Sequence, residues 1–99
     1  MNKDILNLLG LCSRSGNIAT GDILIKNIRK RSVYFVIIAS DASENTKKKI
    51  SDKCKFYNIN YIIEGTSFEL SKAIGKENRM AVGITNRGFT KKLKEKIGG

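Results

Sequence analysis

Two glycines frame the stretch of this chain whose residue types could bind an anion. Gly16 and Gly21 lie five residues apart in a small, polar run that leads directly into an apolar helical pattern. Glycine adopts backbone angles that other residues avoid, and the first amide groups of a helix have no partner within the helix. A helix beginning at Gly21 would therefore offer N–H donors to phosphate. The simpler alternative is that both glycines serve only a tight connection.

The overall charge indicates what the anion would belong to. The chain has 19 Lys and Arg against 9 Asp and Glu in 99 residues, for a formal net charge of +10. A surplus of this size indicates a polyanionic partner, and nucleic acid is the first candidate. The aromatic residues, Tyr34, Tyr57, Tyr61 and four phenylalanines, lack the paired pattern of a base-stacking surface, so we expect them in the core. This favours structured RNA recognised by its shape and backbone.

Residues suited to catalysis or metal binding are scarce. The chain has no histidine and two distant cysteines, so no zinc spacing, catalytic triad or carboxylate pair can be assembled. The run from Gly16 to Ile23 looks like a nucleotide-binding P-loop, but Asp22 and Ile23 stand where that loop needs Lys and Ser or Thr. We therefore expect a protein that is not an enzyme and that uses no metal and no cofactor.

The elements that must position these residues alternate along the chain. Apolar spacing predicts helices over residues 4–14, 21–31, 41–57, 66–74 and 88–96, and strands over 33–39, 61–63 and 80–85 beside a short extended piece at 17–20. Asp41 and Glu44 have capping-box spacing, so Asp41 is expected to cap the third helix. The alternation predicts the α/β class: a three-layer α/β/α sandwich with a central four-stranded mixed sheet, in one domain over residues 1–99.

Two further features concern the surface and the compartment. Five lysines of the third helix form a basic face that is either solvated surface or a second phosphate contact, namely Lys47, Lys48, Lys49, Lys53 and Lys55.

Cys12 and Cys54 fall at apolar helix positions, which is typical of buried thiols in a reducing compartment. Because we also find no signal peptide and no apolar run of membrane-spanning length, we expect a cytoplasmic protein.

Several motifs also occur in a specific order over nearly the whole chain. They are LLGL (8–11), the loop GNIATG (16–21), SDASENTKKK (40–49), DKC (52–54), AIGK (73–76) and GF (88–89). Together they resemble the bacterial YlxQ-type proteins of the superfamily of ribosomal proteins that bind kink-turn RNA, the L-seven-Ae and L-thirty-e superfamily. The resemblance implies the same α/β/α sandwich and a non-catalytic, ribosome-associated protein that recognises kinked or structured RNA.

The resemblance also implies two RNA-contacting regions. In the family, the start of the second helix reaches sheared G·A pairs at the kink, and the loop before the last strand covers a flipped-out nucleotide. The first region maps onto Gly21, Asp22, Lys26 and Arg29, and the second onto Gly75, Lys76, Glu77, Asn78, Arg79 and Met80. A plain helix stop and polar turn, with Met80 in the core, is the alternative for the second region.

The chain departs from the family pattern at the first region. Lys26 follows Gly21 by five residues where the family has six, and Asp22-Ile23 stands in place of an Asn-Glu pair. Phosphate contact by the helix terminus and Lys26 needs no such pair. This departure motivates an alternative function, a protein-interaction adaptor on the same fold without specific RNA binding. We expect a monomer whose partners are ribosomal or other kink-turn RNA and ribosomal proteins, and no membrane.

Overall fold

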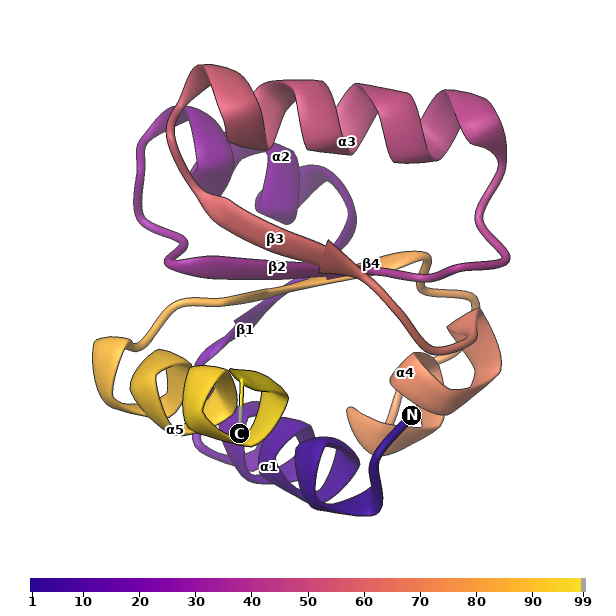
Figure 1. The fold of residues 1–99 in the computed structure, drawn as a ribbon, viewed down its shortest axis with the longest axis vertical. Helices are drawn as coiled ribbons and strands as arrows, with labels where there is room; N and C mark the ends of the chain where they lie inside the picture. Colours follow the sequence, from indigo (N-terminus) through magenta and orange to yellow (C-terminus); the bar gives the residue numbers. More distant parts are fainter. Residues whose placement is uncertain (99) are drawn as a thin grey trace.

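A mixed sheet of four strands forms the middle of the molecule (Figure 1). The computed structural model describes residues 1–98. The strands are β1 (Ile18–Ala19), β2 (Phe35–Ile38), β3 (Asn60–Ile63) and β4 (Ala81–Ile84), in the order β1-β4-β2-β3. β2 runs parallel to β3 and antiparallel to β4, and β1 runs antiparallel to β4. The predicted four-stranded mixed sheet is therefore confirmed.

Helices cover both faces of this sheet. They are α1 (Lys3–Arg14), α2 (Gly21–Arg29), α3 (Glu44–Phe56), α4 (Ser67–Ala73) and α5 (Arg87–Gly98). Figure 1 shows α2 and α3 on one face and α1, α4 and α5 on the other, which confirms the α/β/α sandwich. None of the helices described over residues 1–98 is long and apolar enough to cross a membrane.

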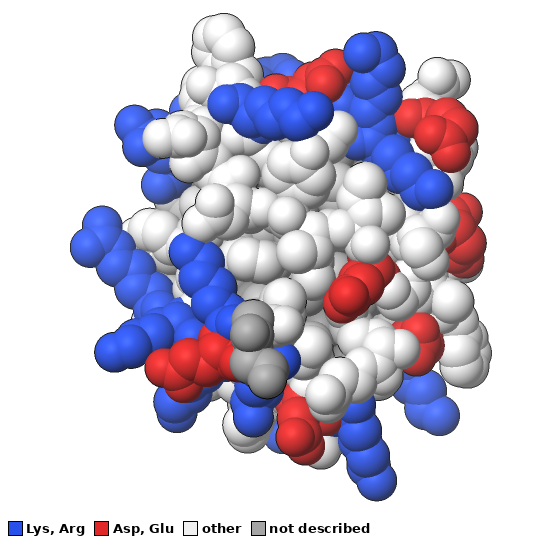
Figure 2. All heavy atoms as spheres, in the orientation of Figure 1, with Lys and Arg blue, Asp and Glu red and all other residues white. Residues whose placement is uncertain are grey.

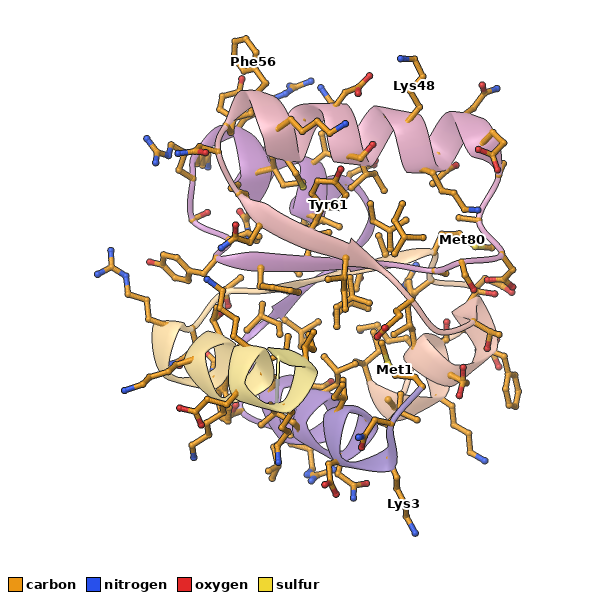
Figure 3. The ribbon with its side chains drawn as sticks, in the orientation of Figure 1. Met1, Lys3, Lys48, Phe56, Tyr61 and Met80 are labelled. Carbon is orange, nitrogen blue, oxygen red and sulfur yellow. The ribbon has the colours of Figure 1, made fainter. Side chains whose placement is uncertain are left out.

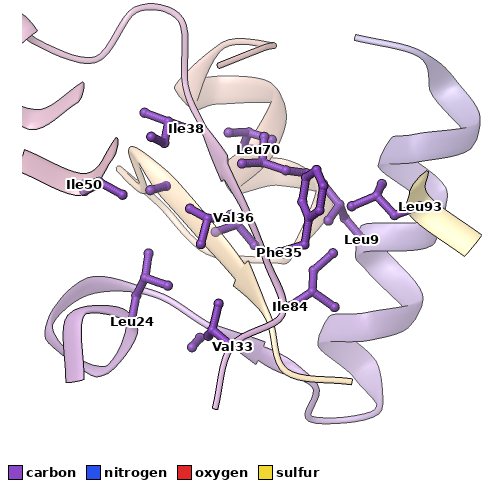
Figure 4. Close-up of a cluster of buried hydrophobic side chains, with 14 of the residues drawn as sticks. Leu9, Leu24, Val33, Phe35, Val36, Ile38, Ile50, Leu70, Ile84 and Leu93 are labelled. Carbon is purple, nitrogen blue, oxygen red and sulfur yellow. The ribbon is translucent and has the colours of Figure 1, made fainter. Parts of the chain in front are cut away.

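The central strands are apolar throughout because both of their faces are covered. Every residue of β2 and of β4 is buried. Figure 4 shows Phe35 of β2 pointing toward Leu9 and Leu93, while the next residue, Val36, points to the other side, where Leu24 lies. Alternation of this kind follows from the pleat of a strand. Full burial of one such side chain stabilises the fold by about 1.5–3 kcal/mol.

Gly83 of β4 lets α2 lie close to the sheet. A Cβ atom at this position would collide with Cδ1 of Leu24 and lie 3.1 Å from Cγ2 of Val33. Leu24 and Val33 are both buried, so neither side chain has free space to move into. The missing side chain therefore fixes the depth at which α2 packs, and with it the position of the start of α2.

The cap of α3 differs from the prediction. Ser43, not Asp41, is the N-cap, because its side chain accepts a hydrogen bond from the backbone N–H of Thr46. Asp41 instead accepts from the backbone N–H of Ser67 at 2.7 Å and from the Ser67 hydroxyl at 2.9 Å. These two bonds lower the pKa of the Asp41 carboxyl below its usual value. Asp41 thus ties the connection after β2 to the first turn of α4.

Two phenylalanines contradict the expectation that the aromatic residues are core. The side chains of Phe56 and Phe68 are 81% and 72% exposed. Each lies two positions from a buried residue of its own helix, Cys54 in α3 and Leu70 in α4. A step of two residues turns about 200° around a helix, so both rings face solvent. Tyr34, Tyr57 and Tyr61 are half-buried.

The two cysteines are buried free thiols, as predicted, and they lie in separate layers. Cys12 lies in α1 and Cys54 in α3, on opposite sides of the sheet (Figure 1). Burial raises the pKa of both thiols to about 11. Both groups are therefore protonated at neutral pH. Among residues 1–98, no three His, Cys, Asp or Glu side chains are grouped so that they could hold a metal ion.

Candidate nucleic-acid interface

A groove of about 280 Å³ lies at the end of the sheet where β2 stops and β4 starts. The backbone N–H of Ala39, just after β2, donates to the carbonyl of Met80, just before β4. Figure 3 shows Met80 at this end of the sheet. The groove is lined by the start of α2, one side of α3 and the segment before β4: Gly21, Asp22, Leu24, Ile25, Thr46, Lys49, Ile50, Asn78, Arg79, Met80 and Ala81.

The start of α2 offers unpaired backbone donors to this groove. Gly21 has a φ of +61°, and the residue before it, Thr20, makes no side-chain capping bond. The other helices described in residues 1–98 begin with side-chain caps, from Asn2, Ser43, Thr66 and Asn86. No atom lies within 4 Å of where a Cβ of Gly21 would be, so this end of the helix is open to a ligand. It combines free N–H groups with the positive end of the helix dipole.

The loop on the other side of the groove is held rigidly against α4. Gly75 has a φ of +70° and ends α4 in a Schellman motif, in which the N–H of Lys76 donates to the carbonyl of Ser71 at 2.9 Å. The hydroxyl of Ser71 also accepts from the N–H of Arg79 at 2.8 Å and donates to its carbonyl at 3.3 Å. Both ends of the loop are therefore fixed to one helix.

Arg79 lines the groove and carries an unsatisfied donor. Within residues 1–98, its Nε atom is buried and has no hydrogen-bond partner. Leaving a buried donor unpaired costs about 1–3 kcal/mol, and more for a charged group. An acceptor that reached this nitrogen would remove that cost, and phosphate oxygens are suitable acceptors for a guanidinium group.

Comparison with known proteins identifies the family. Residues 3–94 match the model of the "Ribosomal protein L7Ae/L30e/S12e/Gadd45 family". The chain belongs to this family. The matched residues include the start of α2, α3 and the loop before β4, so all three sides of the groove fall within the family domain.

Two curated relatives of this L7Ae-family chain are named "RNA-binding protein YlxQ". The protein from Bacillus subtilis (strain 168) is 41% identical over 87 residues, which are 87% of each chain. The protein from Enterococcus faecium is 43% identical over 95 residues, covering 95% of this chain and 91% of the relative. The family and its YlxQ members confirm the resemblance read from the sequence and place the chain among non-enzymatic proteins.

Solved structures confirm the L7Ae-type fold. A structure titled "The structure of a protein with unknown function from Bacillus halodurans C" superposes with a TM-score of 0.92 at 37% identity, covering 99% of this chain and 100% of the other. The "Giardia lamblia 15.5kD RNA binding protein" superposes with a TM-score of 0.80, covering 99% and 88%. Because its identity is 20%, this second likeness concerns the fold alone.

The structure gathers only part of the residue set predicted for this L7Ae-family chain. Five of the ten predicted residues line the groove: Gly21, Asp22, Asn78, Arg79 and Met80. Met80 is 39% exposed, so the alternative that it is a core residue is wrong. Lys76 and Glu77 line a neighbouring hollow of about 430 Å³, which shares Asn78 with the groove.

The remaining predicted residues lie outside both hollows. Gly75 ends α4 and shapes the loop. Lys26 is exposed one turn beyond Asp22 and so lies on the same side of α2. Arg29 is the last residue of α2, about 12 Å along the helix axis from Gly21 at 1.5 Å per residue. A ligand in the groove would therefore have to extend along α2 to reach it.

Sequence reasoning missed the contribution of α3. Thr46, Lys49 and Ile50 line the groove, although neither RNA-contacting region mapped from the family includes a residue of this helix. Nor do its lysines act as one surface: Lys47 pairs with Glu44 at 3.5 Å and Lys48 with Asp52 at 3.2 Å. Their spacing of i, i+3 and i+4 predicts that Thr46, Lys49 and Ile50 share one face of the helix. It does not predict that this face lies beside α2.

Proposed function

We propose that this chain is a non-catalytic RNA-binding protein that recognises kinked or structured RNA, of kink-turn type, at the groove. One observation carries the proposal: one groove is lined both by the uncapped N-terminus of α2 at Gly21 and by Arg79, whose Nε is buried without a partner among residues 1–98. Both groups are suited to bind a phosphate. The names of the YlxQ relatives and the net charge of +10 support RNA as the molecule that supplies this phosphate.

The two sides of the groove would hold different parts of the RNA. The first amides of α2 would bind a phosphate, and the Asp22 carboxylate would accept from base amino groups near the kink. Lys26, and farther along α2 Arg29, would follow the same strand by charge. In this arrangement the phosphate contacts position the RNA, and the Asp22 carboxylate recognises a base.

The loop from Gly75 to Met80 would cover a nucleotide that projects from the stack. Asn78, Arg79 and Met80 line the groove, and Met80 gives it an exposed apolar surface on which a base can pack. Lys76 and Glu77 would lie beside the neighbouring nucleotide. The groove is small and walled by three elements, so a projecting nucleotide fits it better than the continuous surface of a regular duplex.

Titration of matched RNAs tests the proposal. The wild type, Gly21→Val and Arg79→Ala are titrated with a kink-turn RNA and with a fully paired duplex of equal length at one salt concentration. We expect the wild type to prefer the kink-turn and each variant to lose about ten- to a hundredfold in affinity for it, because each removes a charge-assisted contact worth about 1.5–3 kcal/mol. Weak duplex binding by Arg79→Ala should persist.

A matched control separates the groove from general charge. Lys3→Ala removes one cation from the opposite side of the molecule from α3 (Figure 3) and should bind both RNAs as the wild type does. Equal wild-type affinity for the two RNAs would reject kink recognition. A Lys3→Ala variant as weak as Arg79→Ala would reject the groove as the binding site.

An interaction adaptor is a second candidate function, favoured by one observation. Phe68 is exposed over the hollow that Lys76 and Glu77 line, with Lys72 Nζ 5.9 Å from its ring centroid. An exposed aromatic ring in a hollow is typical of protein docking sites. Absence of any salt-sensitive retention of the wild type on RNA would favour the adaptor over the RNA-binding protein.

We further propose that the chain acts as a cytoplasmic monomer on ribosomal RNA, in contact with ribosomal proteins. Two free, buried cysteines suit a reducing compartment. Sedimentation of a cell extract, followed by detection of the protein across the gradient, tests the association. The protein should move with ribosomal particles and be released by high salt, whereas recovery only at the top of the gradient at low salt would contradict ribosome association.

A further inference from the structure

The end of the sheet opposite the groove carries a second basic surface. In the β2–β4 pairing, Ile38 lies opposite Ala81 at the groove end, and Phe35 lies opposite Ile84 at the other end. Tyr34 precedes β2 at this far end, and Arg87 begins α5 shortly after β4 ends there. The far end is therefore separated from the groove by the full length of the two central strands.

We name this region the distal basic surface and define it by Arg31, Tyr34, Arg87, Lys91 and Lys94. Two adjoining hollows open on it, one of about 600 Å³ and one of about 460 Å³, and both are lined by Tyr34 and Arg87. Figure 2 shows Lys and Arg side chains gathered on the side of the molecule where α5 begins. Both hollows are open to solvent, so the side chains that line them are accessible to a ligand.

The charges are arranged in a line beside an aromatic ring. Arg87, Lys91 and Lys94 follow the i, i+4, i+7 spacing that places them on one side of α5. The guanidinium carbon of Arg87 lies 5.2 Å from the ring centroid of Tyr34. Within residues 1–98, none of the four cations forms an ion pair, and Glu95 is the one acidic residue that lines the hollows.

Two of these arginines occupy positions that disfavour them. Arg87 is the first residue of α5, where the helix dipole is positive and a cation is destabilising. Arg31 ends α2 with a φ of +56°, in the left-handed region that α1 and α4 fill with Gly16 and Gly75. Any residue with a Cβ atom there costs about 1–2 kcal/mol relative to an ordinary backbone conformation. The cation–π contact with Tyr34 offsets part of this cost at Arg87, whereas no ion pair within residues 1–98 offsets the backbone cost at Arg31.

We propose that the distal basic surface binds a second RNA segment, so that one copy of the chain bridges two RNA segments. This inference rests on the proposed function, since the groove holds the first segment. A line of cations matches the phosphates of one strand, and the planar guanidinium of Arg87, stacked over the Tyr34 ring, offers a surface on which a base can stack. An acidic protein would use the cations but not the ring, so RNA fits the arrangement better.

A capture experiment tests the bridge. Kink-turn RNA is immobilised and saturated with the full chain, and a second, labelled RNA duplex with a single-stranded tail is then added. The wild type should capture the labelled RNA. Arg87→Glu with Lys91→Glu should reduce capture at least tenfold while retaining the kink-turn RNA, because it reverses two of the four cations. Arg87→Glu also suits the α5 N-terminus, so unfolding would not explain the loss.

The matched control is Lys3→Glu with Lys48→Glu, which changes the net charge equally at two other sides of the molecule (Figure 3). It should capture the labelled RNA as the wild type does. Arg31→Gly should reduce capture while raising the melting temperature, since glycine suits the left-handed backbone. Arg79→Ala should bind the kink-turn RNA more weakly, as stated above, yet bind the tailed duplex free in solution as the wild type does.

Three results would overturn the bridge. A wild type that holds the kink-turn RNA but captures no second RNA leaves the proposed function standing and favours an acidic protein partner at this surface. Equal capture by Arg87→Glu/Lys91→Glu and wild type, or equal loss in the Lys3→Glu/Lys48→Glu control, excludes the distal basic surface. A wild type that binds neither RNA instead rejects the proposed function itself.

Discussion

Arg79 combines a fixed backbone with an unsatisfied side chain. Its N–H and carbonyl are both bonded to the hydroxyl of Ser71, whereas its Nε is buried without a partner among residues 1–98. The two features serve different ends: the Ser71 bonds stabilise the loop, and the guanidinium nitrogen costs stability until an acceptor arrives. Stability and binding should therefore respond oppositely to a change in this side chain.

Replacement of Arg79 by methionine should separate the two effects. Arg79→Met keeps the apolar stem and removes the buried donor, so the free energy of unfolding should stay unchanged or rise by about 1 kcal/mol, while affinity for kinked RNA falls about tenfold. Thermal unfolding and RNA titration measure the two quantities. Ser71→Ala is the control, because it frees the loop backbone but keeps the guanidinium group, and it should lower stability. A clear fall in stability for Arg79→Met would contradict the account.

At the residue scale, the sequence predicted positions that depend on backbone geometry better than those that depend on distant contacts. Gly21 and Gly75 were predictable, because a polar turn before a helix and a helix stop both favour positive φ. Asp41 was not, because its partner, Ser67, lies 26 residues away and Ser43 supplies an equally good cap. Nor does any local pattern reveal that Ser71 holds Arg79.

At the element scale, the link between Asp41 and α4 makes the stability of the fold depend on pH in the acidic range. Hydrogen bonds from Ser67 lower the folded-state pKa of Asp41 below its unfolded value of about 3.9. The stabilisation is therefore present above about pH 4 and is lost as pH falls through the folded-state pKa. Bonds from the N-terminal ammonium and the Thr66 N–H lower the pKa of Glu69 in the same direction.

Asp41→Asn should weaken that acid dependence. We expect the variant to be less stable than the wild type at pH 7 and to lose less stability between about pH 5 and about pH 3, because the uncharged amide cannot titrate. Urea unfolding at both pH values measures the difference. Glu69 remains in the variant, so part of the acid dependence should persist. An equal loss in both proteins would contradict a stabilising role of the Asp41 carboxylate.

The packing of α2 on β4 gives a second prediction at this scale. Gly83→Ala should destabilise the fold by about 1–3 kcal/mol, because the new methyl group overlaps Leu24 in a filled core. Urea unfolding measures the cost. Leu24→Ala makes room for that methyl group, so the double variant should be more stable than the sum of the two single effects predicts. Simple additivity would show that Leu24 is not the obstacle.

The helices and strands were largely predictable, but their neighbours were not. Apolar periodicity located each element to within a few residues, since one side of each helix must be buried. The same periodicity does not predict which helices lie next to each other. The groove was therefore not predictable, because it depends on α3 placing Thr46 and Lys49 across from the segment before β4.

At the scale of the whole molecule, the total charge follows from the sequence, but its distribution over the surface does not. A net charge of +10 indicates a polyanion, yet it does not distinguish one binding surface from two. The fold separates the cations, with Arg79 near one end of the central strands and Arg87 near the other. The length of RNA that one copy can engage follows from that separation.

Salt dependence should report this division. A short kink-turn RNA that contacts about four phosphates should lose roughly two decades of affinity when salt rises from about 50 to about 200 mM. An RNA long enough to reach both the groove and the distal basic surface should show a steeper slope, because more counterions are released. Arg87→Glu with Lys91→Glu should return the slope of the long RNA to that of the short one and leave the short RNA nearly unchanged. Filter binding at several salt concentrations measures all four slopes. A flat response for the short RNA would contradict phosphate binding at the groove, and equal wild-type slopes for the two RNAs would contradict a second contact.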